Sequence, residues 1–369
     1  WLTANRGGAA GVMISASHNP SPDNGIKFFS GAGFKLPDDV EEAIEALLDA
    51  PEDLLPRPTG SDLGTVVDRP DLVEAYVLHV GSLIPEGLSG MRLAVDVGHG
   101  AAYAIAPRVL RALGAEVKVL NDAPDGDNIN RDCGSTHLEG LCETVRAGGY
   151  QLGLAFDGDA DRLLAVDENG RPVDGDHLML ICLEHALATG RLKKPSVVAT
   201  VMSNLGFEEA LARLGGELVR AKVGDRYVLE EMLKRDIRLG GEQSGHLIFL
   251  DDNTTGDGLN SAVRLLSAIR AAKKPLSELA AGMTDYPQTL KNVRVVSTQG
   301  WQEKAAIQQA IREAERELEG TGRLLVRASG TEPLIRVMVE GKDETQIHAV
   351  ADRLVELITR ELTATPQAV

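Results

Sequence analysis

The sequence predicts a multi-domain α/β protein, in which mixed sheets flanked by helices form the first three domains and an α+β domain forms the last. Three observations carry this prediction. The chain has 369 residues, more than one hydrophobic core usually accommodates. A strand–helix–strand unit occurs twice, and strands joined through a helix favour parallel or mixed sheets. Towards its end the chain changes to two long amphipathic helices among short strands.

Loops and shifts in composition divide the chain into four predicted domains. An amphipathic helix over 38–48, capped by Asp38, and a proline-containing loop over 51–58 lie near the end of the first domain. A connecting helix over 71–82 opens the second, and a linker over 284–287 separates the third from the last. The predicted domains are residues 1–69, 70–168, 169–284 and 285–369.

Ser17 and His18 lie where a predicted buried strand gives way to a loop. The apolar run over 12–14 ends in a turn-forming cluster around Asn19 and Pro20. Such a junction can present a nucleophile, although a serine beside Asn-Pro is more often a turn or cap residue. Taken alone, this stretch leaves both interpretations open.

The repeated unit covers residues 93–120 and again residues 197–220. In both copies a strand leads to a helix, a glycine stop and a second strand. The junctions Ala-Leu-Gly-Ala-Glu-Val-Lys-Val and Arg-Leu-Gly-Gly-Glu-Leu-Val-Arg also look alike. The strands of the two units are predicted over 93–97, 117–120, 197–201 and 218–220. In the last domain the pattern predicts strands over 293–296, 324–327 and 335–340, and helices over 302–319 and 345–362.

Asp157, Asp159 and Asp161 follow an apolar strand predicted over 152–156. Three carboxylates at alternate positions can converge on one hard cation, and Mg²⁺ prefers oxygen ligands and keeps room for a phosphate oxygen. A calcium EF-hand does not fit, because Arg162 stands where that loop needs glycine and a strand, not a helix, precedes it. A solvated acidic turn stays the alternative.

A glycine-flanked cluster, Gly-Glu-Gln-Ser-Gly-His, begins at Gly241. Glycines let the backbone approach a ligand, and Glu242 and Ser244 offer the acceptors and donors that sugar hydroxyls require. His246 by itself is more often a structural residue than an acid or base.

A second polar loop lies in the last domain, between Arg327 and Arg336. It reads Arg-Ala-Ser-Gly-Thr-Glu-Pro-Leu-Ile-Arg and contains Ser329, Gly330 and Thr331. Hydroxyls and backbone N–H groups between two arginines can clamp a dianion.

Together these stretches resemble the α-D-phosphohexomutases, and in particular their phosphoglucosamine branch. Ser-Ala-Ser-His-Asn-Pro, followed by Asp-Asn-Gly-Ile-Lys, is similar to the phosphoserine loop of that family. Gln243 and the run over 125–137 resemble the phosphoglucosamine pattern, and Lys-Val-Gly-Asp-Arg over 222–226 resembles a further family loop that could otherwise be a salt-bridged turn. The turn over 97–100 departs from the family pattern. The resemblance covers essentially the whole chain and implies the phosphohexomutase architecture, with the phosphoserine, metal, sugar and phosphate loops in successive domains.

The resemblance implies a phosphoryl group on Ser17 and one Mg²⁺ per chain. The ligands would be Asp157, Asp159, Asp161 and a phosphate oxygen on Ser17. The metal would offset charge during in-line transfer, which depends on positioning and electrostatic stabilisation. The catalytic candidates are Ser17, His18, Lys27 and His246. Without the resemblance, Lys27 would be a solvent-facing residue and His18 a partner of the loop.

The implied reaction interconverts glucosamine 6-phosphate and glucosamine 1-phosphate through glucosamine 1,6-bisphosphate, which also serves as activator. The product leads to UDP-N-acetylglucosamine and cell-wall precursors. The substrate-binding candidates are Arg162, Gly224, Asp225, Arg226, Glu242, Ser244, Arg327, Ser329, Gly330, Thr331 and Arg336. Three alternatives stay open: a phosphoglucomutase/phosphomannomutase, a catalytically silent sugar-phosphate binding protein, and a metal-dependent phosphatase.

Composition narrows the partners to small molecules. The formal net charge of −17 argues against nucleic acid, and the longest apolar stretch, over 178–183, is too short to cross a membrane. Three cysteines without Cys-x-x-Cys spacing indicate a reducing compartment, so we expect the cytoplasm. A homodimer is one option for the oligomeric state.

The chain opens at Trp1 and reaches the serine loop within seventeen residues. The resemblance implies roughly half a domain before this point. We therefore expect an N-terminally incomplete sequence, whose activity depends on what that half-domain would supply.

Overall fold

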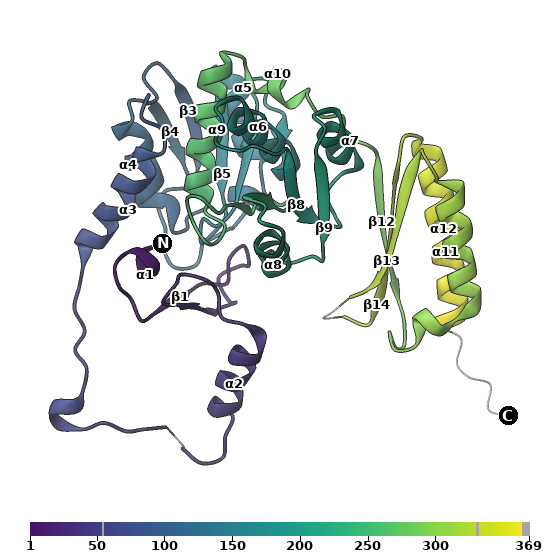
Figure 1. The fold of residues 1–369 in the computed structure, drawn as a ribbon, viewed down its shortest axis with the longest axis horizontal. Helices are drawn as coiled ribbons and strands as arrows, with labels where there is room; N and C mark the ends of the chain where they lie inside the picture. The colour runs from purple at the N-terminus through teal and green to yellow at the C-terminus, as the bar shows by residue number, and fades with distance from the viewer. Residues whose placement is uncertain (54, 330–331, 364–369) are drawn as a thin grey trace. The chain divides into compact units, whose positions relative to one another are not determined.

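The computed structural model describes residues 1–53, 55–329 and 332–363 (Figure 1). The chain forms two compact units, each with buried apolar side chains of its own. Unit 1 contains Trp1–Thr200 and Val219–Gly282, and unit 2 contains Val201–Leu218 and the described residues from Met283 onward. In the described part of the chain, no helix has the length and apolar character needed to cross a bilayer.

Unit 1 begins with a two-stranded antiparallel hairpin that pairs Val12 with Phe28 and Ile14 with Ile26. Val12 and Ile14 are 62% and 72% exposed, so the prediction of a buried strand is wrong in this structure. A two-stranded hairpin packs one face and leaves alternate side chains uncovered. The predicted cap at Asp38 is also wrong, because Pro37 precedes the helix and Asp38 lies in its first turn. The elements here are α1 (Leu2–Asn5), β1 (Ala10–Ile14), β2 (Ile26–Ser30), α2 (Asp38–Leu48), η1 (Gly60–Asp62) and α3 (Pro70–Ser82).

A five-stranded sheet follows, in the order β4-β3-β5-β6-β7. Strands β4, β3 and β5 are parallel, whereas β6 and β7 are antiparallel additions. The elements are β3 (Arg92–Asp96), α4 (Ala102–Ala112), β4 (Glu116–Leu120), η2 (Gly134–Thr136), α5 (Glu139–Gly148), β5 (Leu152–Phe156), β6 (Leu163–Val166) and β7 (Pro172–Val173). Strand β5 is the central strand and is buried along its whole length, and the three aspartates follow its carboxyl end.

A four-stranded sheet has the order β11-β10-β8-β9. Strand β10 runs parallel to β8 and antiparallel to β11, so the turn between β10 and β11 lies beyond the carboxyl end of a parallel strand. Helices α6 and α9 pack against each other, and α8 packs on β8 and β10. The elements are α6 (Gly175–Ala188), β8 (Ser196–Thr200), β9 (Glu217–Ala221), α8 (Asp225–Arg235), β10 (Leu239–Gly241), β11 (Leu247–Phe249), α9 (Gly258–Ala272) and α10 (Leu276–Ala280).

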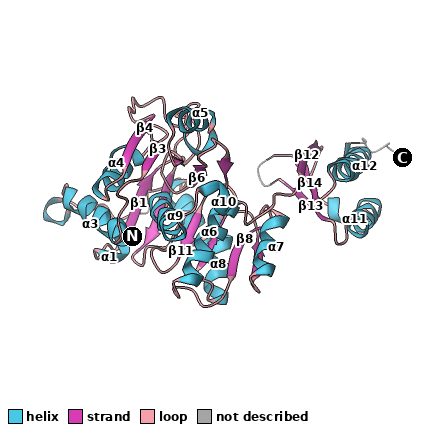
Figure 2. Cartoon of the chain, turned by 90° about the horizontal axis from the view of Figure 1, so that it is seen from above, coloured by secondary structure: helices cyan, strands magenta, loops and turns pink. Residues whose placement is uncertain are grey.

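Unit 2 holds a three-stranded antiparallel sheet in the order β12-β14-β13. Two long helices, α11 and α12, lie side by side on one face of this sheet, and Ile307, Val350 and Leu354 enter the core between them (Figure 2). The elements are α7 (Leu205–Arg213), β12 (Gln288–Arg294), η3 (Trp301–Glu303), α11 (Ala305–Glu317), β13 (Gly322–Ala328), β14 (Leu334–Gly341) and α12 (Glu344–Thr363).

The four-domain division stays a prediction, because the two compact units follow a different partition. Strand β7 joins the five-stranded sheet although it follows the predicted boundary at residue 168. Both ends of each strand predicted for the repeated units lie within one residue of the ends of the observed strand.

Candidate active site

Ser17 lies in the loop between β1 and β2, which brings it to the metal-loop residues that follow β5. Its Oγ donates a hydrogen bond of 2.8 Å to Asp157 Oδ2. Its φ of 53° is in the left-handed region, which is uncommon for a residue with a β carbon. Ser15 Oγ accepts from Ser17 N at 2.8 Å and donates to Asp159 Oδ2 at 3.0 Å, so a second contact ties this loop to the carboxylates.

Asp157, Asp159 and Asp161 converge as the sequence predicts, with one oxygen of each within 4.8 Å of the others. Asp157 and Asp159 are buried at 0% and 9% exposure. Asp159 Oδ1 is buried without a hydrogen-bond partner in the described part of the chain, and the buried Asp161 Oδ1 has His246 Nδ1 3.4 Å away. A buried oxygen without a partner, in a set of three carboxylates, suits a hard divalent cation, so the residues present fit Mg²⁺.

The pKa values of the three-aspartate cluster also favour a bound cation. Burial, together with the charges of Asp161 and Asp159, raises the pKa of Asp157 to about 7. Burial also opposes ionisation of Asp161, but His246 and Lys27 outweigh it and hold the pKa of Asp161 below its ordinary value. Carboxylates that repel one another in a buried site are stabilised by a bound cation.

Lys27 extends from β2 into the cluster. Its Nζ lies 2.5 Å from Asp159 Oδ2 and 3.2 Å from Asp161 Oδ2, so the solvent-facing alternative does not hold. Burial lowers the pKa of Lys27, but the two aspartates together raise it above its ordinary value. Lys27 is therefore held as a cation beside these carboxylates.

His18 and His246 have different surroundings. His18 Nδ1 lies 3.4 Å from Ser17 Oγ, and burial followed by the charge of Arg162 lowers the pKa of His18, which favours its neutral form. His246 is 3% exposed, with Nδ1 3.4 Å from Asp161 Oδ1 and Nε2 3.7 Å from Asp225 Oδ2. Its ring nitrogens face carboxylates, and its predicted acid/base role stays a prediction.

The predicted sugar loop forms the turn between β10 and β11. Glu242 bridges two loops, because its Oε1 accepts from Gly224 N at 3.1 Å and its Oε2 accepts from the exposed Ser244 Oγ at 3.1 Å. The structure thus brings the loops over 222–226 and 241–246 together.

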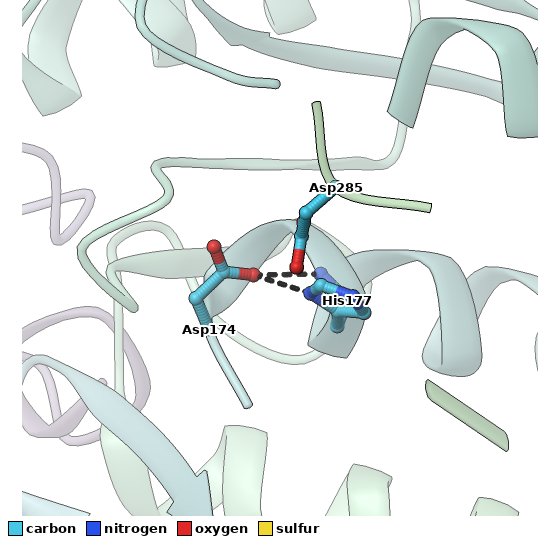
Figure 3. Close-up of side chains that lie close together, drawn as sticks. All are labelled: Asp174, His177 and Asp285. Atoms are coloured by element: carbon cyan, nitrogen blue, oxygen red, sulfur yellow. Dashed lines mark hydrogen bonds and ion pairs between the residues drawn. The ribbon is translucent and has the colours of Figure 1, made fainter. Parts of the chain in front are cut away.

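Gln243, the residue that distinguishes the phosphoglucosamine pattern, takes part in a hydrogen-bond network behind this loop. Its Nε2 donates to Asp174 Oδ2 at 3.0 Å. The other Asp174 oxygen lies 2.7 Å from His177 Nδ1, and this pair is drawn in Figure 3. Gln243 therefore connects the turn between β10 and β11 to Asp174, the N-cap residue of α6.

The two charged residues that follow Gly224, Asp225 and Arg226, form ion pairs with other residues of unit 1. Asp225 forms an ion pair with Lys35. Arg226 pairs with Asp38 and with Glu230, the latter at 2.8 Å. Burial works against ionisation of Asp225, but His246 and Lys35 hold its pKa below the ordinary value. These contacts connect the hairpin segment to helix α8.

In unit 2, Arg327 on β13 and Arg336 on β14 are direct cross-strand neighbours. Burial and then the charge of Arg336 lower the pKa of Arg327. Ser329 Oγ accepts from Glu332 N at 3.3 Å. The predicted residues Gly330 and Thr331 lie outside the described residues.

Four family models match successive parts of the chain. They describe the phosphoglucomutase/phosphomannomutase alpha/beta/alpha domains I, II and III, over residues 1–54, 74–170 and 174–286, and the C-terminal domain, over 290–357. A phosphoglucosamine mutase from Symbiobacterium thermophilum is 59% identical over 352 residues, covering 95% of this chain and 78% of the relative. Another, from Geobacillus thermodenitrificans, is 51% identical over 362 residues, covering 98% and 81%. The chain belongs to the phosphoglucosamine mutase family.

Solved structures with a similar fold come from more distant phosphohexomutases. A phosphoglucomutase/phosphomannomutase family protein from Burkholderia thailandensis has a TM-score of 0.77 at 24% identity, covering 96% of this chain and 77% of that chain. The N-acetylphosphoglucosamine mutase of Aspergillus fumigatus, solved with GlcNAc-6P and magnesium, has a TM-score of 0.76 at 18% identity, covering 98% and 91%. At sequence identities of 24% and 18%, these two structures show that the chain shares their fold.

Membership in the phosphoglucosamine mutase family supports the predicted fold class, and unit 1 assembles most of the predicted site. The residues brought together there are Ser17, His18, Lys27, Asp157, Asp159, Asp161, Arg162, Gly224, Asp225, Arg226, Glu242, Ser244 and His246. The phosphate-loop residues Arg327, Ser329 and Arg336 belong to unit 2.

Sequence reasoning did not single out three residues that contact this candidate site. Ser15 bridges the two loops, Lys35 pairs with Asp225, and Asn130 contacts the backbone of the serine loop. The Ser-Ala-Ser spacing is a signal for Ser15, since residues two apart on an extended segment share a face. Asn130 lies in the run over 125–137 noted above, but its contact with the serine loop, like that of Lys35 with Asp225, joins residues too far apart in sequence for a local pattern to show.

Proposed function

We propose that this chain interconverts glucosamine 6-phosphate and glucosamine 1-phosphate through a phosphoserine at Ser17 and glucosamine 1,6-bisphosphate. One observation carries the proposal: Ser17 Oγ lies 2.8 Å from Asp157 Oδ2, inside a carboxylate cluster that fits Mg²⁺. The names of the similar relatives support glucosamine phosphate as the substrate.

Asp157, Asp159 and Asp161 would hold one Mg²⁺ per chain. When bound, the ion supplies electrostatic stabilisation of the transferring phosphoryl group. The magnesium in the Aspergillus fumigatus structure supports this assignment. Lys27, held as a cation beside the same carboxylates, would stabilise negative charge at the transfer site.

The transfer itself proceeds through Ser17. A free hydroxyl of the sugar monophosphate gives up its proton and attacks the phosphorus on phosphorylated Ser17. The bond from phosphorus to Ser17 Oγ breaks, Oγ takes up a proton, and the sugar becomes the bisphosphate. In the return step Ser17 Oγ attacks the phosphorus of the other phosphate, and the bond from that phosphorus to the sugar oxygen breaks. The sugar leaves as the product monophosphate with a proton on the freed oxygen, and the proton on Ser17 Oγ must leave. His18, neutral and 3.4 Å from Oγ, would accept that proton.

Recognition of the sugar and of its second phosphate falls to two other groups. Glu242 and Ser244 would bind the sugar hydroxyls, since carboxylate and hydroxyl groups pair well with them. Arg327 and Arg336 would bind the phosphate that does not react, because a dianion relieves the repulsion between facing arginines.

Peptide mass analysis of the purified protein, with and without glucosamine 1,6-bisphosphate and Mg²⁺, tests the proposal. We expect a phosphoryl group on Ser17 that passes to added glucosamine 1-phosphate. The variant Ser17→Ala should take up none, whereas the control Ser21→Ala, in the same loop, should behave like the parent chain.

Other outcomes would overturn parts of the proposal. Sugar-phosphate binding without modified Ser17 would favour a silent binding protein, and release of inorganic phosphate would favour a phosphatase. Faster transfer to glucose or mannose phosphates would overturn the sugar assignment. We also predict a cytoplasmic location, where precursor synthesis would take place, and cell fractionation tests it. The predicted homodimer is tested by light scattering.

A further inference from the structure

The loop over 125–137 contacts the nucleophile loop through Asn130, a residue that the reaction above does not use. Asn130 is 7% exposed. Its Nδ2 donates hydrogen bonds to the carbonyl oxygens of Ser17 and Asn19, each at 2.9 Å. One amide group therefore holds two carbonyls of the nucleophile loop, on either side of His18.

Asn130 is itself held in place. Its backbone has a φ of 57°, a conformation that asparagine tolerates better than most residues, and its N–H donates to Gly98 O at 3.0 Å. Its Oδ1 is buried without a hydrogen-bond partner among the described residues. Leaving this oxygen unpaired costs free energy, so the contacts of Nδ2 determine the orientation of the amide.

The metal loop lies against the same carbonyl. A β carbon at Gly158 would stand 2.4 Å from Ser17 O and 2.7 Å from Asn130 Nδ2. The Ser17 carbonyl is thus enclosed by Asn130 and Gly158, and the glycine between Asp157 and Asp159 makes room for it.

We propose that Asn130 is a positioning residue for phosphoryl transfer. By holding the Ser17 carbonyl it keeps Ser17 in its disfavoured left-handed conformation, and that conformation directs Oγ towards Asp157. Without the amide donor, Ser17 returns to an ordinary backbone conformation and Oγ turns away from the transfer site. This inference rests on the proposed function of Ser17 as the nucleophile.

The variant Asn130→Asp tests it, because aspartate keeps the shape and the tolerance of a positive φ but places an oxygen against two carbonyl oxygens. We expect the rate of transfer from phosphorylated Ser17 to fall roughly 10- to 100-fold, while KM for glucosamine 1-phosphate changes less than about threefold. The matched control is Asn128→Asp, since the Asn128 side chain accepts from Asp125 N and donates to Ala123 O, both in its own loop. The control should transfer at the parent rate.

Two further measurements separate positioning from general damage. Mn²⁺ affinity should stay within about threefold of the parent, because Asn130 does not touch the carboxylates in the described hydrogen bonds. Amide hydrogen exchange over residues 11–27 should rise at least about tenfold in the substrate-free variant but not in the control. If Asn130→Asp does not fold, Asn130→Gly removes the donor and keeps the backbone freedom, and it should give the same pattern.

An unchanged transfer rate, or a rate that falls only in step with Mn²⁺ affinity, would overturn the positioning role. Failure of the proposed function looks different, because the parent chain itself would then take up no phosphoryl group on Ser17. In that case the exchange measurement still decides whether Asn130 holds the loop.

Discussion

Ser17 donates a 2.8 Å hydrogen bond to Asp157 across 140 positions of sequence. The bond joins the end of a two-stranded hairpin to the carboxyl end of a buried strand in the five-stranded sheet. Ser17 thus lies in a hairpin of only two strands, and its position depends on contacts with the better-packed loop that carries Asp157, Asp159 and Asp161. Changes in those contacts should affect the reaction more than they affect folding.

Gly158→Ala should impair transfer, because the new β carbon would meet Ser17 O at 2.4 Å, and a backbone atom cannot move aside cheaply. We expect the transfer rate to fall roughly 100-fold. Gly140→Ala is the matched control in α5, where a β carbon meets nothing within 4 Å, and it should raise the free energy of unfolding by about 0.5 kcal/mol. Equal transfer rates in the two variants would contradict the close packing of the two loops.

His246→Gln should weaken metal binding. The imidazole supports Asp161 from behind, and loss of a partner of a metal ligand lowers affinity roughly 10- to 100-fold. Titration with Mn²⁺ followed by electron paramagnetic resonance measures this directly. His348→Gln, at a half-exposed position on α12, should bind Mn²⁺ as the parent does. Unchanged affinity in His246→Gln would show that Asp161 does not need this support.

Stability should fall in acid through His185. Burial lowers the pKa of His185 below its ordinary value of 6.5; the charge of Glu86 opposes this shift, and the charges of Arg191 and Arg264 add to it. A depressed pKa means that the folded state favours the neutral His185 ring. The contribution of this ring to the free energy of unfolding is therefore fully present above pH 6.5 and is lost as pH falls through the pKa of the folded state. Thermal unfolding from pH 7.5 to 5.5 should depend less on pH in His185→Gln. A parallel dependence would contradict this origin.

The cysteines should resist alkylation in the folded protein. Burial raises the pKa of Cys133 and of Cys182 to about 12, and the thiolate is the reactive form. Intact mass after iodoacetamide at pH 8 should show at most one adduct, on the half-buried Cys142, whereas denatured protein should show three. Rapid labelling of Cys182 in the native state would indicate local opening around α6.

Local sequence patterns predicted the strands of the repeated units because those strands are buried and continuously apolar. Strand β12 shows the limit. It runs from Gln288 to Arg294 rather than over 293–296, and only Thr289 and Val293 along it are buried. An edge strand with so few apolar residues gives a weak signal.

The candidate site was predictable where its residues form compact local clusters, as the three aspartates do. Contacts between clusters were not, since packing between distant loops leaves no periodicity in the sequence. Asn130 lies 113 positions from Ser17, and Lys35 lies 190 from Asp225. Exposed Val12 shows the same limit, because an apolar run predicts a strand but not which layer covers it.

The facing arginines of unit 2, Arg327 and Arg336, allow an effect on phosphate binding to be distinguished from an effect on folding stability. Arg327 and Arg336 are cross-strand neighbours, and like charges directly opposite each other destabilise a sheet. Arg327→Met should therefore leave the melting temperature unchanged or raise it, while KM for glucosamine 1-phosphate rises roughly 10- to 100-fold through loss of a charged hydrogen bond to phosphate.

Arg323→Met, on the same strand as Arg327, provides the contrast for this prediction. Arg323 pairs with Glu340, which is 0% exposed, and removing one partner of a buried ion pair costs about 3–5 kcal/mol. That variant should lose stability first, whereas Arg327→Met should lose affinity first, as measured by thermal unfolding beside steady-state kinetics. If Arg327→Met lowered the melting temperature and left KM unchanged, Arg327 would be a structural residue of the sheet, and the phosphate contact would have to come from Arg336 or from the loop between the two strands.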